Sequence, residues 1–324
     1  MLTSIILSLS LLAPPGSVVS GGDPYFLLLS RLEAADLVVL GTVQEVRLVE
    51  AYLKPPETRA VVAIQAYWQG TLQQEPQKVQ VRNWGGPSAD PDRVVPWVLF
   101  LARHSRDGKP WLELQHAVDL ELLPGSRADA FKRRVASFQK VRGMPPGKGR
   151  RKATVMWLME QIPDPESRES ATYELERPAL HRLLAPRQVE RLFNVFCSLD
   201  EFDLIAGHLT DILNEVATDR QRFLRCALHL LASEAKQGSW ALADLVAAIT
   251  DSVAHGELFD LADAFLATEP PADLRGYHDT PELKEARRLV LARFVEVATA
   301  VLEGTDLEPA QPADGLADEV SDGG

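Results

Sequence analysis

The stretch AADLVVLGTVQEV, residues 34–46, decides the fold of the first part of this chain. It is rich in β-branched residues, and Thr42, Gln44 and Glu45 bring polar side chains into its second half. A strand that starts in a core and ends half-exposed has this pattern. We therefore expect a core strand here, and not a membrane anchor.

Four further strands are expected at residues 59–68, 78–84, 93–104 and 110–123. The 78–84 segment alternates strictly, and Asp107-Gly108 marks a hairpin turn before the last strand. Pro96 indicates a bulge or a sheet edge. Five short strands joined by turns predict an antiparallel barrel or sandwich.

The order of these segments resembles the netrin-like or tissue-inhibitor-of-metalloproteinase-like barrel of many exported bacterial proteins. The resemblance rests on AADLVVLGTVQEV, VVAIQAYWQG, VQVRNW and VLFLAR, and it covers about residues 25–123. It implies a five-stranded barrel of the oligonucleotide/oligosaccharide-binding type, a binding scaffold whose fold does not fix its ligand. The animal inhibitors chelate the metal of their target with an initial Cys. This region contains no Cys, so protease inhibition is not implied.

An apolar run at residues 5–13 precedes the barrel and is shorter than the ~20 residues of a membrane-spanning helix. Two prolines end it, and Val18 and Ser20 occupy the minus-three and minus-one places of a cleavage site. We expect residues 1–20 to be a signal peptide, and the mature chain to begin near Gly21. This predicts export to a periplasm or outside the cell, with no transmembrane segment. The alternative is a buried N-terminal helix or strand, since no Lys or Arg precedes the apolar core.

From residue 153 to residue 304 the hydrophobic period becomes helical. The clearest helix has Thr280 as its cap and Pro281 in its first turn, and Gly304 ends it. Long helices joined by short loops pair antiparallel. These pairs resemble a HEAT-like stack, with an irregular bundle as the alternative because no residue signature repeats.

The predicted fold class is therefore α+β with two domains. A five-stranded antiparallel barrel at residues 21–125 precedes an all-α helical-hairpin domain at residues 153–304. The tail, residues 305–324, has acids and no bases, and it is expected to be disordered.

The segment 126–152 between the two domains carries ten basic residues and one acid. Phe131, Val135 and Phe138 form one stripe of an expected helix, and the sequence GMPPGKG predicts a hinge. One interpretation is a surface for phospholipid headgroups, acidic polysaccharide or an acidic partner, with Arg133 and Arg134 as contacts. The other is a connecting helix that packs its Phe stripe on the barrel and leaves its charges in water.

Composition narrows the function classes. The chain has 324 residues and a net charge of −12, which argues against a general nucleic-acid binder. The two cysteines, Cys197 and Cys226, are too few for a disulfide scaffold. They are either two buried thiols or one disulfide between neighbouring helices.

Catalytic motifs are absent from the sequence, which has no GxSxG, GxxxxGK[ST], HExxH or CxxC. His208 and Asp211 lie three apart on an expected helix and could face one metal, but no third ligand has suitable spacing. His104 and His116 flank the expected hairpin turn and could meet across it. No catalytic residue, metal ligand or cofactor is assigned.

Aromatic residues and glycines supply the other candidate binding site. Trp84, Gly85 and Gly86 open the stretch WGGPSADPD, and Trp111 follows the hairpin turn. We expect Trp84 and Trp111 to be partly exposed and able to stack on sugars or anchor a protein. The rival interpretation is that Trp84 plugs one end of the barrel.

The function predicted is that of a non-catalytic exported binding protein. The barrel would bind a protein or polysaccharide, and the helical domain would be an interaction scaffold. The alternative is a hydrolase or metal-dependent enzyme whose site is assembled from dispersed residues such as His208 and Asp211.

Overall fold

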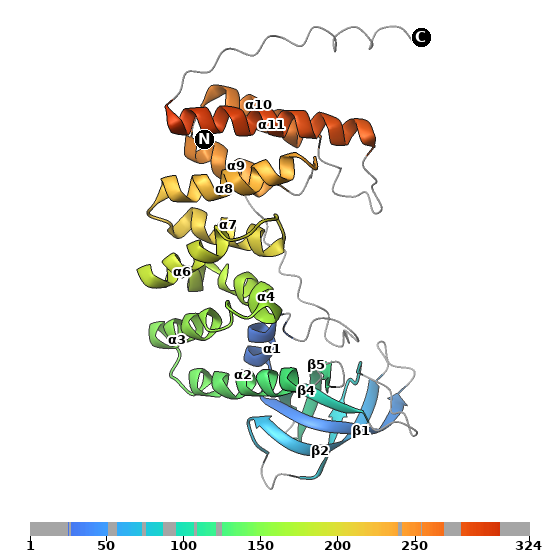
Figure 1. Cartoon of the computed structure of the whole chain (residues 1–324). Helices are drawn as coiled ribbons and strands as arrows, with labels where there is room; N and C mark the ends of the chain where they lie inside the picture. Colours follow the sequence, from blue (N-terminus) through green and yellow to red (C-terminus); the bar gives the residue numbers. More distant parts are fainter. Residues whose placement is uncertain are drawn as a thin grey trace, which may run out of the picture. The chain divides into compact units, whose positions relative to one another are not determined.

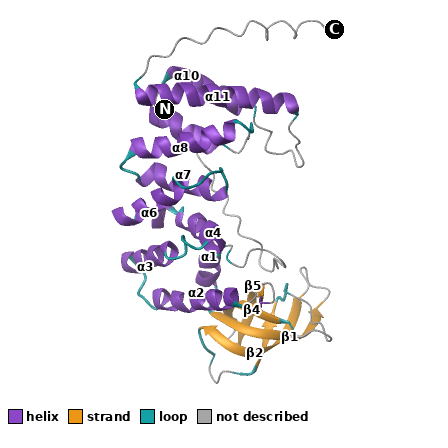
Figure 2. Cartoon of the chain, viewed as in Figure 1, coloured by secondary structure: helices purple, strands orange, loops and turns teal. Residues whose placement is uncertain are grey.

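The computed structural model describes residues 25, 27–50, 57–72, 76–86, 95–106, 109–120, 125–238, 242–253, 255–268 and 280–304. Within them a barrel of strands is followed by a series of helices, as Figures 1 and 2 show. The chain divides into two compact units, Met1–Leu184 and Ala185–Gly324. The expected signal peptide, the Asp107-Gly108 turn and the acidic tail lie outside the described residues.

Five strands form a closed barrel: β1 (Leu37–Glu50), β2 (Glu57–Gln69), β3 (Lys78–Arg82), β4 (Pro96–Arg106) and β5 (Lys109–Asp119). Their order around the barrel is β1-β2-β3-β5-β4. The barrel itself is as predicted, but an all-antiparallel arrangement is wrong. β3 and β5 pair in parallel, through Val81↔Leu112 and Arg82↔Glu113. β1 and β3 are both antiparallel to β2, and β1 and β5 are both antiparallel to β4. β3 and β5 therefore run in the same direction where they pair.

The barrel core comes from strand alternation. Val79 and Val81 on β3 point inward, as do Leu112 and Leu114 on β5. The residues between them face outward or lie half-buried. This is the two-residue period of a strand with one face in a core. The 34–46 stretch supplies Leu37 and Val39 to the same cluster, so its predicted role as core strand is confirmed.

Two residues that interrupt strand patterns have local explanations. A Cβ atom on Gly41 would lie 2.7 Å from the carbonyl oxygen of Ala63, so glycine is what allows β1 and β2 to approach here. Pro96 is the first residue of β4. A missing N–H is tolerated at a strand start, so neither a bulge nor an edge is needed to explain this proline.

The first unit also contains helices α1 (Leu28–Ala34), α2 (Ser126–Arg142), α3 (Lys148–Met159), α4 (Pro165–Leu175) and α5 (Pro178–His181). The short α1 was not predicted from the sequence. Leu28, Leu29 and Leu32 bury its apolar side. Glu174 on α4 accepts hydrogen bonds from the N–H and the hydroxyl of Ser30, each at 2.9 Å. A residue far away in the sequence therefore caps the first turn of α1. Burial raises the pKa of Glu174, although Arg177 beside it acts in the opposite direction.

The second half of the predicted hinge at residues 143–152 is helical. α3 begins at Lys148, so only residues 143–147 link it to α2. α2 and α3 pack against each other, and the boundary between the two compact units falls after Leu184. The basic segment is therefore part of the unit that contains the barrel. Its Gly-Pro composition marks a tight turn between two helices.

The second unit is helical: α6 (Pro186–Phe196), α7 (Leu204–Val216), α8 (Arg220–Ala235), α9 (Ala243–Val253), α10 (Gly256–Leu266) and α11 (Pro281–Glu303). The hydroxyl of Thr280 accepts from the N–H of Leu283 at 3.3 Å, and Gly304 ends α11 at φ 69°. Both predicted ends of this helix are confirmed. In the parts of the chain that the structure describes, no helix is long and apolar enough to cross a membrane.

A disulfide joins Cys197, at the end of α6, to Cys226 within α8. Both residues are half-buried. The structure contains the disulfide, so the alternative interpretation of two buried free thiols is wrong. The two cysteines are 29 residues apart in the sequence, and this spacing alone does not show that they are close in space.

Candidate functional site

Trp84, the centre of the predicted barrel site, is buried. Its side chain is 4% exposed and belongs to the core cluster of the barrel. Its N–H donates to the carbonyl of Thr58 at 3.2 Å, and the Thr58 hydroxyl donates to the carbonyl of Trp84 at 2.6 Å. The expectation of a partly exposed Trp84 is therefore wrong, and its ring packs inside the barrel.

The inward direction of Trp84 has a backbone cause. Strict alternation from Val79 and Val81 would place residue 83 inside and residue 84 outside. Asn83 instead has φ 50°, in the left-handed region that Asn tolerates better than most residues. This one residue reverses the phase of the strand, so Trp84 turns into the core.

The adjoining glycines serve the same packing. A Cβ atom on Gly86 would lie 2.6 Å from the Leu114 side chain and 2.7 Å from the Trp84 ring. Glycine therefore lets the chain cross closely over the buried indole. Gly85 is exposed, and residues 87–92 of the same predicted loop lie outside the described residues.

Trp111, the second aromatic candidate, is half-buried beneath polar neighbours. Its ring stacks on His104 with centroids 5.4 Å apart, and the Arg82 guanidinium lies 5.4 Å from its centroid. His104 Nε2 is 2.9 Å from Glu113 Oε2, and the Asn83 amide donates to the other oxygen at 3.2 Å. Trp111 is therefore partly exposed, as predicted, but His104 and Arg82 lie against its ring.

The two histidines near the hairpin do not meet. His104 is opposite Trp111 in the ladder, whereas His116 is opposite Phe100. His116 is buried, and its ring centroid is 5.9 Å from that of Phe100. Burial, and then the charge of Arg31, lower the pKa of His116 to about 3. Its imidazole is therefore neutral at physiological pH.

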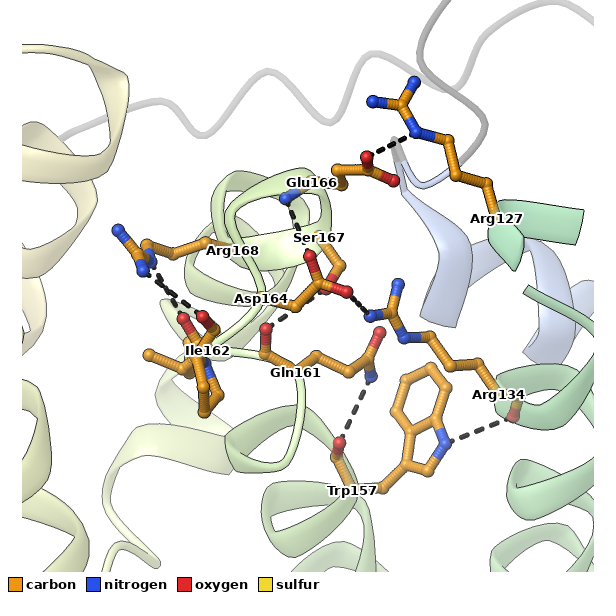
Figure 3. A network of polar contacts seen from close by, with 10 residues as sticks. Arg127, Arg134, Trp157, Gln161, Ile162, Asp164, Glu166, Ser167 and Arg168 are labelled. Carbon is orange, nitrogen blue, oxygen red and sulfur yellow. Dashed lines mark hydrogen bonds and ion pairs between the residues drawn. The ribbon is translucent and has the colours of Figure 1, made fainter. Parts of the chain in front are cut away.

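Three cations of the basic segment are tied into the protein. Arg134 pairs with Asp164, and its guanidinium lies 4.5 Å from the centroid of the Tyr25 ring. Arg127 Nε is 2.6 Å from Glu166 Oε1 (Figure 3). Arg142 bonds the Ala35 carbonyl at the end of α1. Arg134, a predicted anion contact, therefore already has a carboxylate partner.

The network in Figure 3 fixes α3 and α4 to α2. The Trp157 indole donates to the Ser137 hydroxyl at 2.9 Å, and its ring centroid is 5.0 Å from that of Phe138. Asp164 Oδ1 accepts from the N–H of Glu166 at 3.0 Å and so caps α4. The α2–α3 pair is consequently held by side chains from three elements.

The other seven cations of the segment have no ion pair with any described residue. The chain has no Asp or Glu between Asp129 and Glu160. Arg133, the remaining predicted contact, is exposed and belongs to this set. The set is Lys132, Arg133, Lys140, Lys148, Arg150, Arg151 and Lys152.

Most of these cations gather around the link between α2 and α3. Residues 143–149 are all exposed, as are Arg151 and Lys152. The first turn of α3 contains no acid, and Gly147 makes no side-chain cap. Cations at this end of a helix add to the positive end of its dipole. The local potential is thus positive although the net charge of the chain is negative.

Apolar side chains are exposed among the same cations. Met144 is 38% exposed and Met156 is 59% exposed. Pro145 and Pro146 are exposed beside Met144. The Met144 methyl lies 4.0 Å from the position of a Cβ on Gly149, so it rests against the start of α3. Together these residues form the α2–α3 turn surface: Lys140, Met144, Pro145, Pro146, Lys148, Arg151, Lys152 and Met156.

Sequence reasoning found the basic segment but not the two methionines. Lys148, Lys152 and Met156 recur every four residues, and this spacing places them on one face of α3. That periodicity was the available signal. The Gly and Pro residues of the segment 143–152, which favour a hinge, conceal this helical spacing.

His208 and Asp211, the candidate metal pair, both lie on α7. His208 is half-buried and Asp211 is exposed. Among the described residues, no group of three or more His, Cys, Asp or Glu side chains is placed to hold a metal ion.

The sequence was also compared with known proteins. No protein-family model matches the chain, and no curated protein matches it either.

Proposed function

We propose that this chain is an exported, non-catalytic binding protein whose α2–α3 turn surface binds a polyanion. The observation that carries the proposal is the group of seven cations without a carboxylate partner among the described residues. Three other cations of the same segment do have carboxylate or carbonyl partners. Carboxylates therefore neutralise Arg127 and Arg134, whereas the other seven cations, most of them exposed, are available to a partner.

Electrostatics favours a function for this arrangement. Like charges repel, and the start of α3 carries them where the helix dipole is already positive. Local conflicts of this kind are expected at functional sites, where an interaction with a partner offsets them. A polyanion would offset the repulsion at several cations together. The attraction should weaken as salt is added, because exposed charges are screened.

Export is supported by two independent features. Residues 1–20 have the layout of a signal peptide. The disulfide between Cys197 and Cys226 suits an oxidising compartment. N-terminal sequencing of the exported protein should give a start near Gly21, and a start at Met1 would contradict export by cleavage.

The barrel and the second unit are proposed to serve as scaffolds. In this proposal the barrel is netrin-like, and its core anchors the α1 and α2 helices. The second unit is a HEAT-like or irregular helical scaffold for a protein partner. The resemblance to these families remains a prediction.

Binding of dextran sulfate to the full-length chain tests the polyanion proposal. The variant Lys148→Glu/Arg151→Glu/Lys152→Glu should bind at least about tenfold more weakly. A matched control, Arg187→Glu/Arg191→Glu/Arg225→Glu, makes the same change in net charge at exposed residues of the second unit. It should bind nearly as well as the unaltered chain. Equal losses in both variants would show that only net charge matters, and would contradict a specific surface.

A further inference from the structure

We propose that the polyanion is a lipid bilayer with anionic headgroups, and that the α2–α3 turn surface docks on it with its apolar tip in the interface. This inference rests on the proposed function and names the partner. A soluble polysaccharide or an acidic protein is the competing partner, and the experiment below separates these outcomes.

The apolar residues of the surface favour a bilayer. Met144, Pro145 and Pro146 are exposed at the tip of the turn, and Met156 is exposed four residues after Lys152. A hydrophilic polyanion offers little apolar surface to cover these side chains. A bilayer interface offers both anionic headgroups and acyl chains, so it matches a basic surface with an apolar tip.

The cations stand where headgroups would lie if the tip entered the interface. Lys140 ends the exposed face of α2, and Lys148, Arg151 and Lys152 start α3. These residues therefore flank the Met-Pro-Pro tip from both sides in the sequence. Long Lys and Arg stems can lie along an apolar surface while their charged ends reach the headgroups. Each such cation near an anionic bilayer contributes to the attraction.

The turn is also held in place by the packing behind it. Figure 1 draws the turn at the ends of α2 and α3 that point away from the barrel strands of the same unit. Behind it, Phe138 and Trp157 are in ring contact, and Trp157 donates a hydrogen bond to Ser137. A surface that is ordered before it binds loses less conformational entropy on binding.

The charge of the whole chain gives the docking a direction. With a net charge of −12, most of the molecule is repelled by an anionic bilayer. The basic segment, with ten bases and one acid, is the exception. Attraction and repulsion therefore both favour an approach with the turn toward the lipid.

Co-flotation of the full-length chain with vesicles tests this inference. Vesicles of phosphatidylglycerol should bind the chain, and vesicles of phosphatidylcholine should bind it far more weakly. Lys148→Gln/Arg151→Gln/Lys152→Gln should weaken binding to phosphatidylglycerol by about a hundredfold. Met144→Ser/Met156→Ser should weaken it by about tenfold, because less apolar surface is buried. The apolar N-terminal segment is common to all these proteins, so the differences report on the turn.

Dextran sulfate distinguishes this inference from the proposed function. The methionine variant should bind dextran sulfate as well as the unaltered chain does, because that contact needs only charge. Loss of binding to vesicles alone supports the bilayer. If the methionine variant binds phosphatidylglycerol undiminished while the glutamine variant loses both ligands, the bilayer inference is wrong and polyanion binding stands. If the glutamine variant loses neither ligand, both proposals fail.

A fluorescent label gives a second measurement that charge alone would not move. An environment-sensitive fluorophore attached through Pro146→Cys should shift to the blue with phosphatidylglycerol vesicles, because the tip enters an apolar region. The same label attached through Ala136→Cys, on the exposed face of α2, is the control and should shift less. Equal shifts, or no shift at the tip, would overturn insertion.

Discussion

The chain beyond β3 and the chain beyond α2 each combine a large apolar residue with glycines, and yet these apolar side chains lie in opposite environments. NWGG at residues 83–86 and GMPPG at residues 143–147 each combine a large apolar residue with glycines at the end of a regular element. Trp84 is 4% exposed, whereas Met144 is 38% exposed. One stretch therefore closes a core, and the other forms a surface.

The difference comes from what surrounds each stretch. Trp84 packs in the core cluster of the barrel, to which Leu114 also belongs. The left-handed Asn83 turns its side chain toward that core. Met144 lies in the turn between two packed helices, and its methyl is 4.0 Å from the position of a Cβ on Gly149 at the start of α3. Glycine and proline thus permit a turn, but the neighbouring elements decide which way its apolar residue points.

The largest expected effect is that of Trp84→Ala. Removing a buried indole from the barrel should lower the free energy of unfolding by about 3–5 kcal/mol. Urea unfolding followed by circular dichroism would measure it, with Trp84→Phe as the milder control. A loss below about 1 kcal/mol together with weaker ligand binding would restore the rival view of Trp84 as a binding residue.

A pair of glycine substitutions sharpens the same contrast. Gly41→Ala should destabilise the protein by about 1–3 kcal/mol, because its Cβ would press on the Ala63 carbonyl. Gly149→Ala, in the first turn of α3, should be neutral or stabilise by up to about 1 kcal/mol, since its nearest neighbour is 4.0 Å away. Thermal unfolding compares the two variants. Equal losses would mean that the start of α3 is as tightly packed as the barrel.

The two regions should also differ in their response to pH. The pKa of His116 is lowered from 6.5 to about 3, so the folded state resists its protonation. Stability due to the neutral imidazole is complete above pH 6.5 and is lost as pH falls toward 3, by roughly 1.4 kcal/mol per pH unit.

Unfolding of His116→Phe across this range is the measurement, and its pH dependence should be shallower than that of the unaltered chain. Anion binding by the turn should not follow the same curve, because His116 lies on β5 of the barrel and not in the turn. An unchanged slope in the variant would assign the acid sensitivity to groups other than His116. Glu174 is not one of them, because its raised pKa makes its contribution to stability grow as pH falls.

The smallest effect is expected at the turn itself. Met144→Ser should change the free energy of unfolding by no more than about 0.5 kcal/mol, because the side chain is exposed. Denaturant titration beside Trp84→Ala would show the contrast directly. A loss above about 2 kcal/mol would show that Met144 is a packing residue, and would remove it from the docking surface.

Several features followed from the sequence because their causes are local. Strand alternation identified the barrel strands, and the Thr280 cap and Gly304 fixed both ends of α11. The run of bases without acids identified the cationic segment. These signals depend on residues within a few positions of each other, so no knowledge of the fold was needed.

Other features were decided by tertiary structure because they depend on distant residues. The parallel β3–β5 pair required the position of β4, and the disulfide required α6 and α8 to become neighbours. Asp164 pairs with Arg134, and Glu166 pairs with Arg127. Glu174 caps α1, which is far away in the sequence. The sequence by itself determined where strands, helices and charges occur. Only packing decided that Trp84 is enclosed and that the α2–α3 turn surface is open, because burial depends on which neighbours the fold supplies.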